Sequence, residues 1–404
     1  MARQNASRAP SETRVSSYNA SFSAIGVRRD RGSFQLSLPS LPFRVPNMIE
    51  MTATDRIRGT LLGGAVGDAL GGAIEFMHLS EIRNRFGQAG AQDYAPAYGR
   101  RGAITDDTQM SLFTAEGLIR AWVRAKERGI CSPPGVIHHA YFRWLLTQNE
   151  HPAADIKIGT DGWLFATPGL HSRRAPGNTC LAALRNAAGF GEPSIARNDS
   201  KGCGGVMRVA PIGLFAPAIG DDEQVFTMAV EAAALTHGHP TGFLAAGYLA
   251  VVVAALCRGK QMVPALDDAD SVLRRRKRHT EVKRAIDAAR KLAAAGRPTP
   301  EKLETLGGGW VAEEALAIGI CCAMVANNFA DGVLLAVNHS GDSDSTGSIA
   351  GNLLGAQLGV ASIPTTWLDE LELRAEIDRV ATDLDAIAHG RMTPEEAWQA
   401  YPGW

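Results

Sequence analysis

The sequence predicts an all-α fold, arranged as a compact single-domain helical bundle over residues 48–404. From Asp55 onward the chain is dominated by Ala, Leu and Gly at helical spacing, and runs of alternating β-branched residues are few. Hydrophobic residues make up 45% of the 404 residues, enough to bury a large core without special staples. Residues 48–404 show neither a repeat of 20 to 50 residues nor a linker that would divide them.

The first 47 residues differ from the rest in composition. They hold seven arginines, only two acidic residues, many serines, and several prolines between Pro39 and Pro46. Such a composition disfavours a packed core, so we expect a poorly ordered N-terminal extension over residues 1–47. Three origins stay open: an organelle transit peptide, a start codon misassigned ahead of Met48 or Met51, and a docking arm for a partner.

Two sets of glycines recur every four residues and predict two helices with smooth faces. They are Gly59, Gly63, Gly67 and Gly71, and Gly347, Gly351, Gly355 and Gly359. Each glycine costs a helix about 1 kcal/mol, which close packing must offset. The same pattern occurs in membrane helices, but Asp68 interrupts the first segment, and Asn352 and Gln357 interrupt the second. Neither segment has the run of about 18 apolar residues that a membrane span needs, so we expect central helices of a bundle.

Helical spacing also predicts the remaining main helices in chain order. They cover residues 109–128, 136–148, 223–236, 241–257, 311–327 and 368–389. Prolines at 298 and 300 and three glycines at 307–309 mark two loops between them.

Charge and cysteine usage exclude several classes of protein. The formal net charge of -1 argues against a nucleic-acid binder, and the basic run at residues 274–278 is best explained as a solvated helix face. The six cysteines are scattered, and Cys321 and Cys322 are neighbours in an apolar stretch, so a disulfide framework is not expected. This usage points to a reducing compartment, and we expect a cytoplasmic protein.

Two short acidic clusters carry the strongest functional signal. Residues 105–108 and residues 342–346 lie more than two hundred positions apart, and each opens a predicted apolar helix. Either cluster alone could cap free backbone N–H groups at a helix start. If the fold brings them together, four carboxylates share one pocket, which is costly unless protons or cations offset their repulsion. Oxygen ligands from Asp, Ser and Thr are those that Mg²⁺, Mn²⁺ or Ca²⁺ prefers.

Five motifs occur in order between residues 55 and 360. They are residues 58–63 continuing into 67–71 and Glu75, residues 105–108, residues 202–208, residues 236–240 and residues 341–347. Together they resemble the ADP-ribosylglycohydrolase family, although any one of them alone would be weak. The resemblance implies an all-α domain of the ADP-ribosylglycohydrolase type with two Mg²⁺ ions, or Mn²⁺ in their place. It also implies hydrolysis of the bond between C1 of the distal ribose of ADP-ribose and an acceptor.

Carried over residue by residue, the family's metal ligands fall on six positions. These are Thr105, Asp106, Asp107, Asp342, Asp344 and Ser345. Many relatives have Thr at the last position, and Ser345 supplies the same hydroxyl oxygen. The form of this motif is closest to members of the family that act on ADP-ribosylarginine.

Asp107 and Glu75 are the candidate catalytic residues. Breaking an N-glycosidic bond develops oxocarbenium character at the ribose, and a metal pair can lower the pKa of a bound water and orient it. Asp107 could hold that water or take its proton, and Glu75 is the other candidate general acid or base. Both side chains could instead be structural, and Asp68 is expected to cap or pair within the bundle.

A glycine-rich stretch is the candidate diphosphate site. Its residues Ser200, Gly202, Cys203, Gly204 and Gly205 offer backbone N–H groups with little steric bulk, which suits an anion. By the resemblance this loop lines the phosphates of ADP-ribose, although many relatives carry Asn in place of Cys203. A role for Cys203 as nucleophile is disfavoured, because the sequence shows no positioned His base.

The remaining candidates are one histidine pair and one tryptophan. The resemblance places His237 at the substrate pocket near the ribose or phosphates, and a structural role at the helix start before Pro240 is the alternative. His239 is assigned the structural role. Trp310 is expected in the core or in a hydrophobic staple at its helix.

The sequence therefore predicts a Mg²⁺-dependent enzyme that removes ADP-ribose from a modified protein, with arginine as the expected acceptor. Its partners would be the ADP-ribosylated protein and a cognate ADP-ribosyltransferase, with no membrane and no nucleic acid. Three alternatives stay open: an immunity protein that blocks such a transferase by contact, a hydrolase of another ADP-ribose linkage (serine, nucleic acid or a small molecule), and a metal-dependent phosphoester or nucleotide hydrolase.

Overall fold

The structure is a computed structural model that describes residues 51–189 and 195–403. Within these ranges the regular secondary structure is helical, and the only strand-like pairings are two isolated β-bridges. The predicted all-α fold is confirmed. The predicted extension at residues 1–47 lies outside the described residues and stays a prediction.

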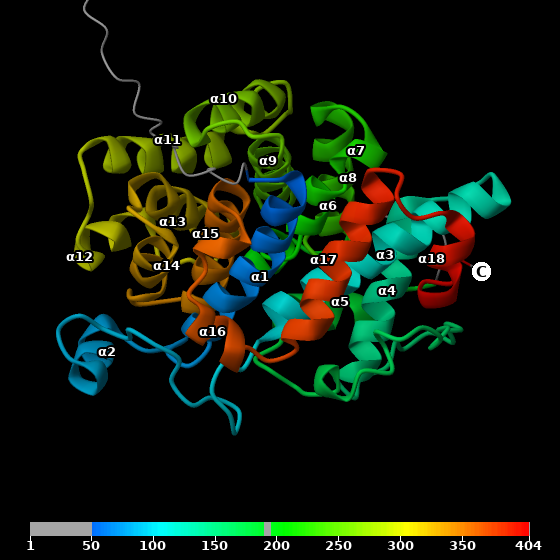
Figure 1. Cartoon of the computed structure of the whole chain (residues 1–404), viewed down its shortest axis with the longest axis horizontal. Helices are drawn as coiled ribbons and strands as arrows, with labels where there is room; N and C mark the ends of the chain where they lie inside the picture. Colours follow the sequence, from blue (N-terminus) through cyan, green and yellow to red (C-terminus); the bar gives the residue numbers. More distant parts are fainter. Residues whose placement is uncertain (1–50, 190–194, 404) are drawn as a thin grey trace, which may run out of the picture. The chain divides into compact units, whose positions relative to one another are not determined.

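Figure 1 shows the helices, with longer connections between α2 and α3 and between α4 and α5. The first nine are α1 (Ala53–Gly71), α2 (Leu79–Phe86), α3 (Asp106–Arg128), α4 (Pro133–Thr147), α5 (Asn178–Arg185), α6 (Ala210–Leu214), α7 (Ala216–Ile219), α8 (Asp222–Ala234) and α9 (Pro240–Cys257). The others are α10 (Met262–Leu273), α11 (Thr280–Ala294), α12 (Pro300–Leu303), α13 (Ala312–Val325), α14 (Phe329–Val337), α15 (Ser343–Leu358), α16 (Thr365–Glu370), α17 (Arg374–Ala388) and α18 (Pro394–Ala400).

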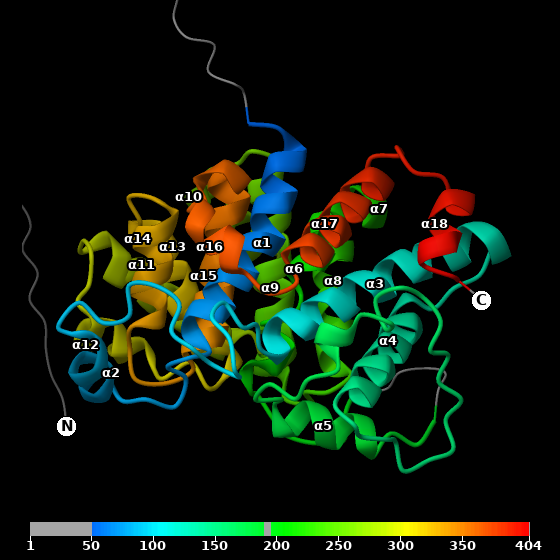
Figure 2. The ribbon, with the colours of Figure 1, turned by 60° about the horizontal axis from the view of Figure 1, so that its bottom comes forward.

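Helices α1 and α15 run side by side through the middle of the bundle. Figure 1 and Figure 2 show α3, α4, α17 and α18 on one side of this pair, and α10 to α14 on the other. Helix α9 packs against α8, α10 and α13. It is long and apolar enough to cross a membrane, but 83% of it is buried inside the protein, as in the core helix of a globular protein.

Glycines make the close approach of α1 and α15 possible. A Cβ added at Gly67 would lie 1.9 Å from the carbonyl oxygen of Gly347, and one at Gly355 would lie 1.9 Å from that of Gly59. No side chain fits at such distances, because the two backbones are already in contact. The prediction of two packed glycine faces is confirmed, and the faces pack on each other. Gly359 is the exception, since it follows α15 with φ +76°.

The antiparallel pairing of α1 and α15 brings the end of α1 to the start of α15. A Cβ added at Gly71, the last residue of α1, would meet the backbone of Ser343, the first residue of α15. The start of α3 is attached to the same end of α1, because Asp68 accepts hydrogen bonds from the backbone N–H groups of Thr105 and Thr108, at 3.0 and 3.1 Å. The structural role expected for Asp68 is confirmed, and both acidic clusters lie at one end of α1.

Most predicted helices are found within a few residues of their expected bounds, but one prediction is wrong. The expected helix at 368–389 is broken into α16 and α17 by residues 371–373, where Leu373 has φ 55°. The carboxylate of Glu372 at this break forms a buried ion pair with Arg174 at 3.1 Å. We attribute the break to this distant partner. The loop at 307–309 is confirmed, whereas the proline loop ends at Thr299, which caps α12.

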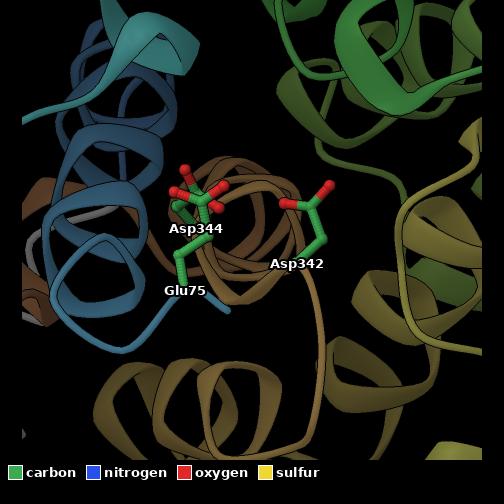
Figure 3. A group of neighbouring side chains, drawn as sticks. All are labelled: Glu75, Asp342 and Asp344. Atoms are coloured by element: carbon green, nitrogen blue, oxygen red, sulfur yellow. The ribbon is translucent and has the colours of Figure 1, made fainter. Parts of the chain in front are cut away.

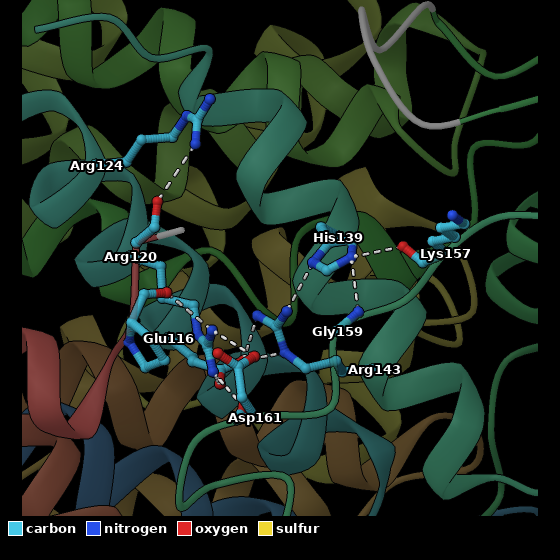
Figure 4. Close-up of polar contacts among 10 residues, drawn as sticks. Glu116, Arg120, Arg124, His139, Arg143, Lys157, Gly159 and Asp161 are labelled. Atoms are coloured by element: carbon cyan, nitrogen blue, oxygen red, sulfur yellow. Dashed lines mark hydrogen bonds and ion pairs between the residues drawn. The ribbon is translucent and has the colours of Figure 1, made fainter. Parts of the chain in front are cut away.

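A buried ionic network fastens α3 to α4 (Figure 4). Glu116 of α3 accepts hydrogen bonds from Arg143 of α4 at 2.8 and 2.9 Å and from Arg120 at 3.1 Å. Arg143 also donates to Nδ1 of His139 at 2.8 Å, and burial together with this guanidinium lowers the pKa of His139 to about 4. Buried charges are tolerated when each is paired in this way, and the network holds the helix that carries Asp106 and Asp107.

Candidate metal and substrate site

The two acidic clusters meet in one pocket of about 300 Å³. Asp106 and Asp107 occupy the first turn of α3, and Asp344 occupies the first turn of α15. Asp342 caps α15 by accepting a hydrogen bond from the backbone N–H of Ser345 at 3.3 Å. All four carboxylates line the pocket, so the structure brings together what the sequence places more than two hundred residues apart.

Glu75 joins this cluster from the turn that follows α1. Oxygens of Glu75, Asp342 and Asp344 lie within 4.8 Å of one another (Figure 3). One oxygen each of Glu75, Asp107 and Asp344 is buried and has no hydrogen-bond partner among the residues that the structure describes. Buried polar atoms are normally paired, so three unpaired carboxylate oxygens at one pocket indicate a missing partner. A hard divalent cation fits this set of oxygens.

Burial and mutual repulsion raise the pKa values of these carboxyl groups. The pKa of Glu75 is raised to about 10, first by burial and then by the charge of Asp344. Burial and the neighbouring acids also raise the pKa values of Asp106, Asp107 and Asp344 well above the ordinary range. The charged forms are therefore costly without a counter-charge, and bound cations would offset that cost.

Two predicted hydroxyl ligands lie beside the carboxylates. The hydroxyl of Thr105 accepts a hydrogen bond from the backbone N–H of Asp107 at 3.3 Å and so caps α3, and this residue does not line the pocket. Ser345 does line the pocket. The assignment of both as metal ligands stays a prediction.

The glycine-rich turn forms another part of the pocket wall. Gly202, Cys203 and Gly204 line the pocket, and the backbone N–H of Cys203 donates to the carbonyl of Trp310 at 3.3 Å. Ser200 and Gly205 were predicted with them but do not line the pocket. The hydroxyl of Ser200 instead braces the turn by accepting from the N–H of Gly202 at 3.3 Å, and Gly205 faces helix α8.

Cys203 is a thiol that serves as a hydrogen-bond donor. Its Sγ lies 2.8 Å from Oδ2 of Asp342. Burial and the charge of Asp342 raise the pKa of Cys203 well above the usual range of a thiol. Because the thiolate is the nucleophilic form, this environment opposes covalent catalysis by Cys203, in agreement with the sequence analysis.

The two histidines of the fourth motif have different roles. His237 is buried and lines the pocket against Gly202 and Gly204. Burial and the nearby Arg208 lower the pKa of His237 to about 3, so its imidazole is neutral at physiological pH. His239 caps α9 by accepting a hydrogen bond from the N–H of Thr241 at 3.2 Å, which confirms its expected structural role.

The expectation for Trp310 is wrong. Its side chain is 43% exposed, lines the pocket, and stacks on Phe76 with ring centroids 5.2 Å apart and planes 22° apart. Phe76 is 68% exposed and has φ 68°, a strained conformation for a bulky residue. An aromatic residue just before a helix can form a hydrophobic staple with that helix or line the rim of a pocket, and the local sequence does not distinguish the two. The partner that decides here, Phe76, comes from a distant segment.

One part of the pocket wall that was not predicted is the loop before α5 together with the first turn of α5. Residues 175–180 line the pocket, and the backbone N–H of Gly177 donates to Asp106 at 3.2 Å. This hydrogen bond places the N-terminus of α5 next to the acidic cluster. The turn signal at Pro176 and Gly177 could have indicated a loop here, but not its contact with Asp106.

Comparisons with known proteins identify relatives of this chain. The sequence model for ADP-ribosylglycohydrolases matches residues 50–394. ADP-ribosyl-[dinitrogen reductase] glycohydrolase of Rhodospirillum rubrum is 27% identical over 341 residues, which cover 82% of this chain and 95% of that protein. ADP-ribosylarginine hydrolase Tri1 of Serratia proteamaculans is 25% identical over 373 residues, covering 90% of this chain and 87% of the relative.

The fold is similar to that of a solved structure described as an ADP-ribosylglycohydrolase-related protein complex. The TM-score is 0.62 at 26% sequence identity, and the match covers 83% of this chain and 99% of the other. The likeness therefore extends over nearly the whole of that chain.

Proposed function

The chain belongs to the ADP-ribosylglycohydrolase family, and we propose that it hydrolyses the bond between ADP-ribose and a modified arginine of a protein, with Mg²⁺ as cofactor. The observation that carries the proposal is the pocket where α1, α3 and α15 meet. There, buried and unpaired carboxylate oxygens lie beside a glycine-rich turn that can receive a diphosphate.

The proposed metal ligands are the acidic side chains of the pocket. Asp106, Asp107, Asp342 and Asp344 would hold the ions, together with the hydroxyls of Thr105 and Ser345, and Glu75 lies close enough to contribute. When bound, Mg²⁺ would supply positive charge that lowers the pKa of a water molecule and orients the ribose hydroxyls.

Two carboxylates are proposed to act on the reacting atoms. Water adds its oxygen to C1 of the ribose, the C1–N bond breaks, and the electron pair of that bond leaves with the guanidine. Asp107 is proposed to hold this water or take its proton, and its unpaired Oδ2 supports that role. The unpaired oxygen of Glu75 supports a role for this residue as the second acid or base.

Arginine is the proposed acceptor for two reasons. One relative is described as an ADP-ribosylarginine hydrolase and matches 90% of this chain. The exposed faces of Phe76 and Trp310 at the pocket also suit a guanidinium, which stacks well on aromatic rings. The six free cysteines support a cytoplasmic location, where such a protein substrate would be met.

A panel of substrates tests the proposal. The protein is incubated with Mg²⁺ and with ADP-ribose linked to arginine, to serine or to DNA, and free ADP-ribose is measured by chromatography. We expect release from the arginine conjugate. Release only from the serine or DNA conjugate would contradict the acceptor, and release from none of them would contradict the proposed reaction.

A further inference from the structure

We propose that Arg208 and Thr236 are positioning residues that fix the proton of His237 on Nε2, so that this N–H is donated to a diphosphate oxygen of ADP-ribose. The inference rests on the proposed function for the identity of the ligand. It concerns a chain of hydrogen bonds that runs from the core to the pocket wall.

The inner end of this chain is the guanidinium of Arg208, which is fully buried. A guanidinium donates hydrogen bonds and accepts none. It donates to the hydroxyl oxygen of Thr236 at 2.7 Å and to the carbonyl of Ala232 at 3.1 Å. The hydroxyl oxygen of Thr236 is therefore an acceptor toward Arg208, and its single hydrogen is left for another partner.

That partner is Nδ1 of His237. Oγ1 of Thr236 lies 2.9 Å from Nδ1 and 3.4 Å from the carbonyl oxygen of Ala233. We assign the hydroxyl hydrogen to the shorter of these two contacts, because hydrogen bonds weaken toward 3.5 Å. Nδ1 then accepts this hydrogen and carries no proton of its own, so the proton of a neutral imidazole must be on Nε2.

Nε2 faces the pocket. A Cβ added at Gly202 would lie 3.4 Å from this nitrogen, so the imidazole lies directly against the glycine-rich turn. His237 lines the pocket although only 1% of it is exposed. Within residues 51–189 and 195–403, Nε2 has no hydrogen-bond partner. A ligand oxygen in the pocket could therefore accept the hydrogen of this N–H.

The environment keeps the imidazole neutral. Burial lowers the pKa of His237 to about 3, and the positive charge of Arg208 acts in the same direction. His237 therefore offers one directed N–H and no net charge. Because the imidazole also lies beside Gly204, its N–H and the backbone N–H of Gly204 would converge on the same anionic group.

The tautomer can be measured directly in the free protein. Nitrogen-15 NMR of the histidine side chains is expected to show a pyrrole-type shift at Nε2 of His237 and a pyridine-type shift at Nδ1. The reverse pattern would overturn the proposal. This measurement needs no turnover, so its failure is distinguishable from a failure of the proposed reaction.

The positioning role is tested with ADP-ribose as the probe in calorimetric titrations. We expect Thr236→Val to raise the Kd about tenfold, since one hydrogen bond to a charged group is lost. Thr236→Ser keeps the hydroxyl and is expected to stay within about twofold of the parent protein, while Thr236→Val is also expected to lose the His237 tautomer pattern.

A double variant separates this role from general damage to the core. In a His237→Ala background, Thr236→Val is expected to change the Kd by less than about twofold, because the residue acts through His237. Equal losses in both backgrounds would overturn the proposal. If Thr236→Val does not fold, the NMR spectrum of the parent and the behaviour of Thr236→Ser still decide.

Discussion

Asp344 shows at the scale of one residue how the pocket depends on a counter-charge. Burial, and next the charge of Asp342, raise its pKa, and its Oδ1 has no partner among the described residues. A raised carboxyl pKa means that the folded state holds its proton more tightly than the unfolded state. The metal-free fold then loses stability as the pH rises above about 4, the pKa of an unfolded Asp, toward the folded pKa.

Asp344→Asn is therefore expected to stabilise the metal-free protein. In EDTA, the Tm of the variant should exceed that of the parent, and the difference should grow from about pH 5 to pH 8. With Mg²⁺ the order should reverse, because the parent gains binding energy that the variant lacks. Calorimetry measures both. The exposed Asp155→Asn serves as control. If the Tm of Asp344→Asn and the Tm of the parent depended on pH in the same way in EDTA, the explanation would be refuted.

Glu75 gives a prediction about turnover. If it acts as acid or base, Glu75→Gln should lower kcat by about 10²- to 10⁴-fold, while binding of ADP-ribose changes much less. The comparison variant is Glu127→Gln, on the exposed end of α3. Steady-state rates and a titration with ADP-ribose separate the two effects. Full kcat in Glu75→Gln would assign this residue a structural role.

Expectations about which single residues line the pocket agree with the structure where the signal was local. The sequence shows acidic residues at predicted helix starts, next to Ser or Thr residues that also carry side-chain oxygens. This local pattern was enough to predict Asp106, Asp107, Asp342 and Asp344. The rim position of Trp310 could not, because it depends on Phe76, which comes from the turn after α1 and adopts a positive φ.

At the scale of secondary-structure elements, the contact between α1 and α15 sets the position of the site. Each turn of one helix meets a glycine of the other, and the antiparallel direction places the start of α15 beside the end of α1. The glycine spacing could be predicted from the sequence, whereas the pairing of the two stripes with each other required the fold. The break between α16 and α17 was not predicted, and Arg174, the partner of Glu372 at this break, is distant in the sequence.

Gly63→Ala tests this contact with a single methyl group. The new Cβ would lie 2.5 Å from the carbonyl oxygen of Gly351 and 2.9 Å from the ring of Phe329, so the helices must separate. We expect a loss of about 1–3 kcal/mol in the free energy of unfolding, and loss of soluble protein for Gly63→Leu.

The matched control for this variant is Gly189→Ala. Gly189 is exposed, and a Cβ added there would meet nothing within 4 Å. Chemical denaturation of both variants and the parent gives the comparison. Equal stability of Gly63→Ala and the parent would show that the helix contact is not as close as described.

At the scale of the whole molecule, every residue assigned to the site lies after residue 55, and the family match begins at residue 50. A shortened chain that begins at Met48 is therefore expected to fold and to hydrolyse ADP-ribosylarginine with unchanged dependence on Mg²⁺. Circular dichroism and a turnover assay compare it with the full chain. A large loss of turnover would show that the first 47 residues help to build the active site.

The central claim is that the carboxylates of the turn after α1 and of the starts of α3 and α15 form a divalent-cation centre for ADP-ribose hydrolysis. The most direct measurement is the rate of ADP-ribose release from an ADP-ribosylarginine protein, first after treatment with EDTA and then as Mg²⁺ is restored. We predict negligible release in EDTA, recovery with Mg²⁺, and no recovery for Asp342→Asn, since the cation loses a charged ligand. Equal rates with EDTA and with Mg²⁺ would contradict the claim.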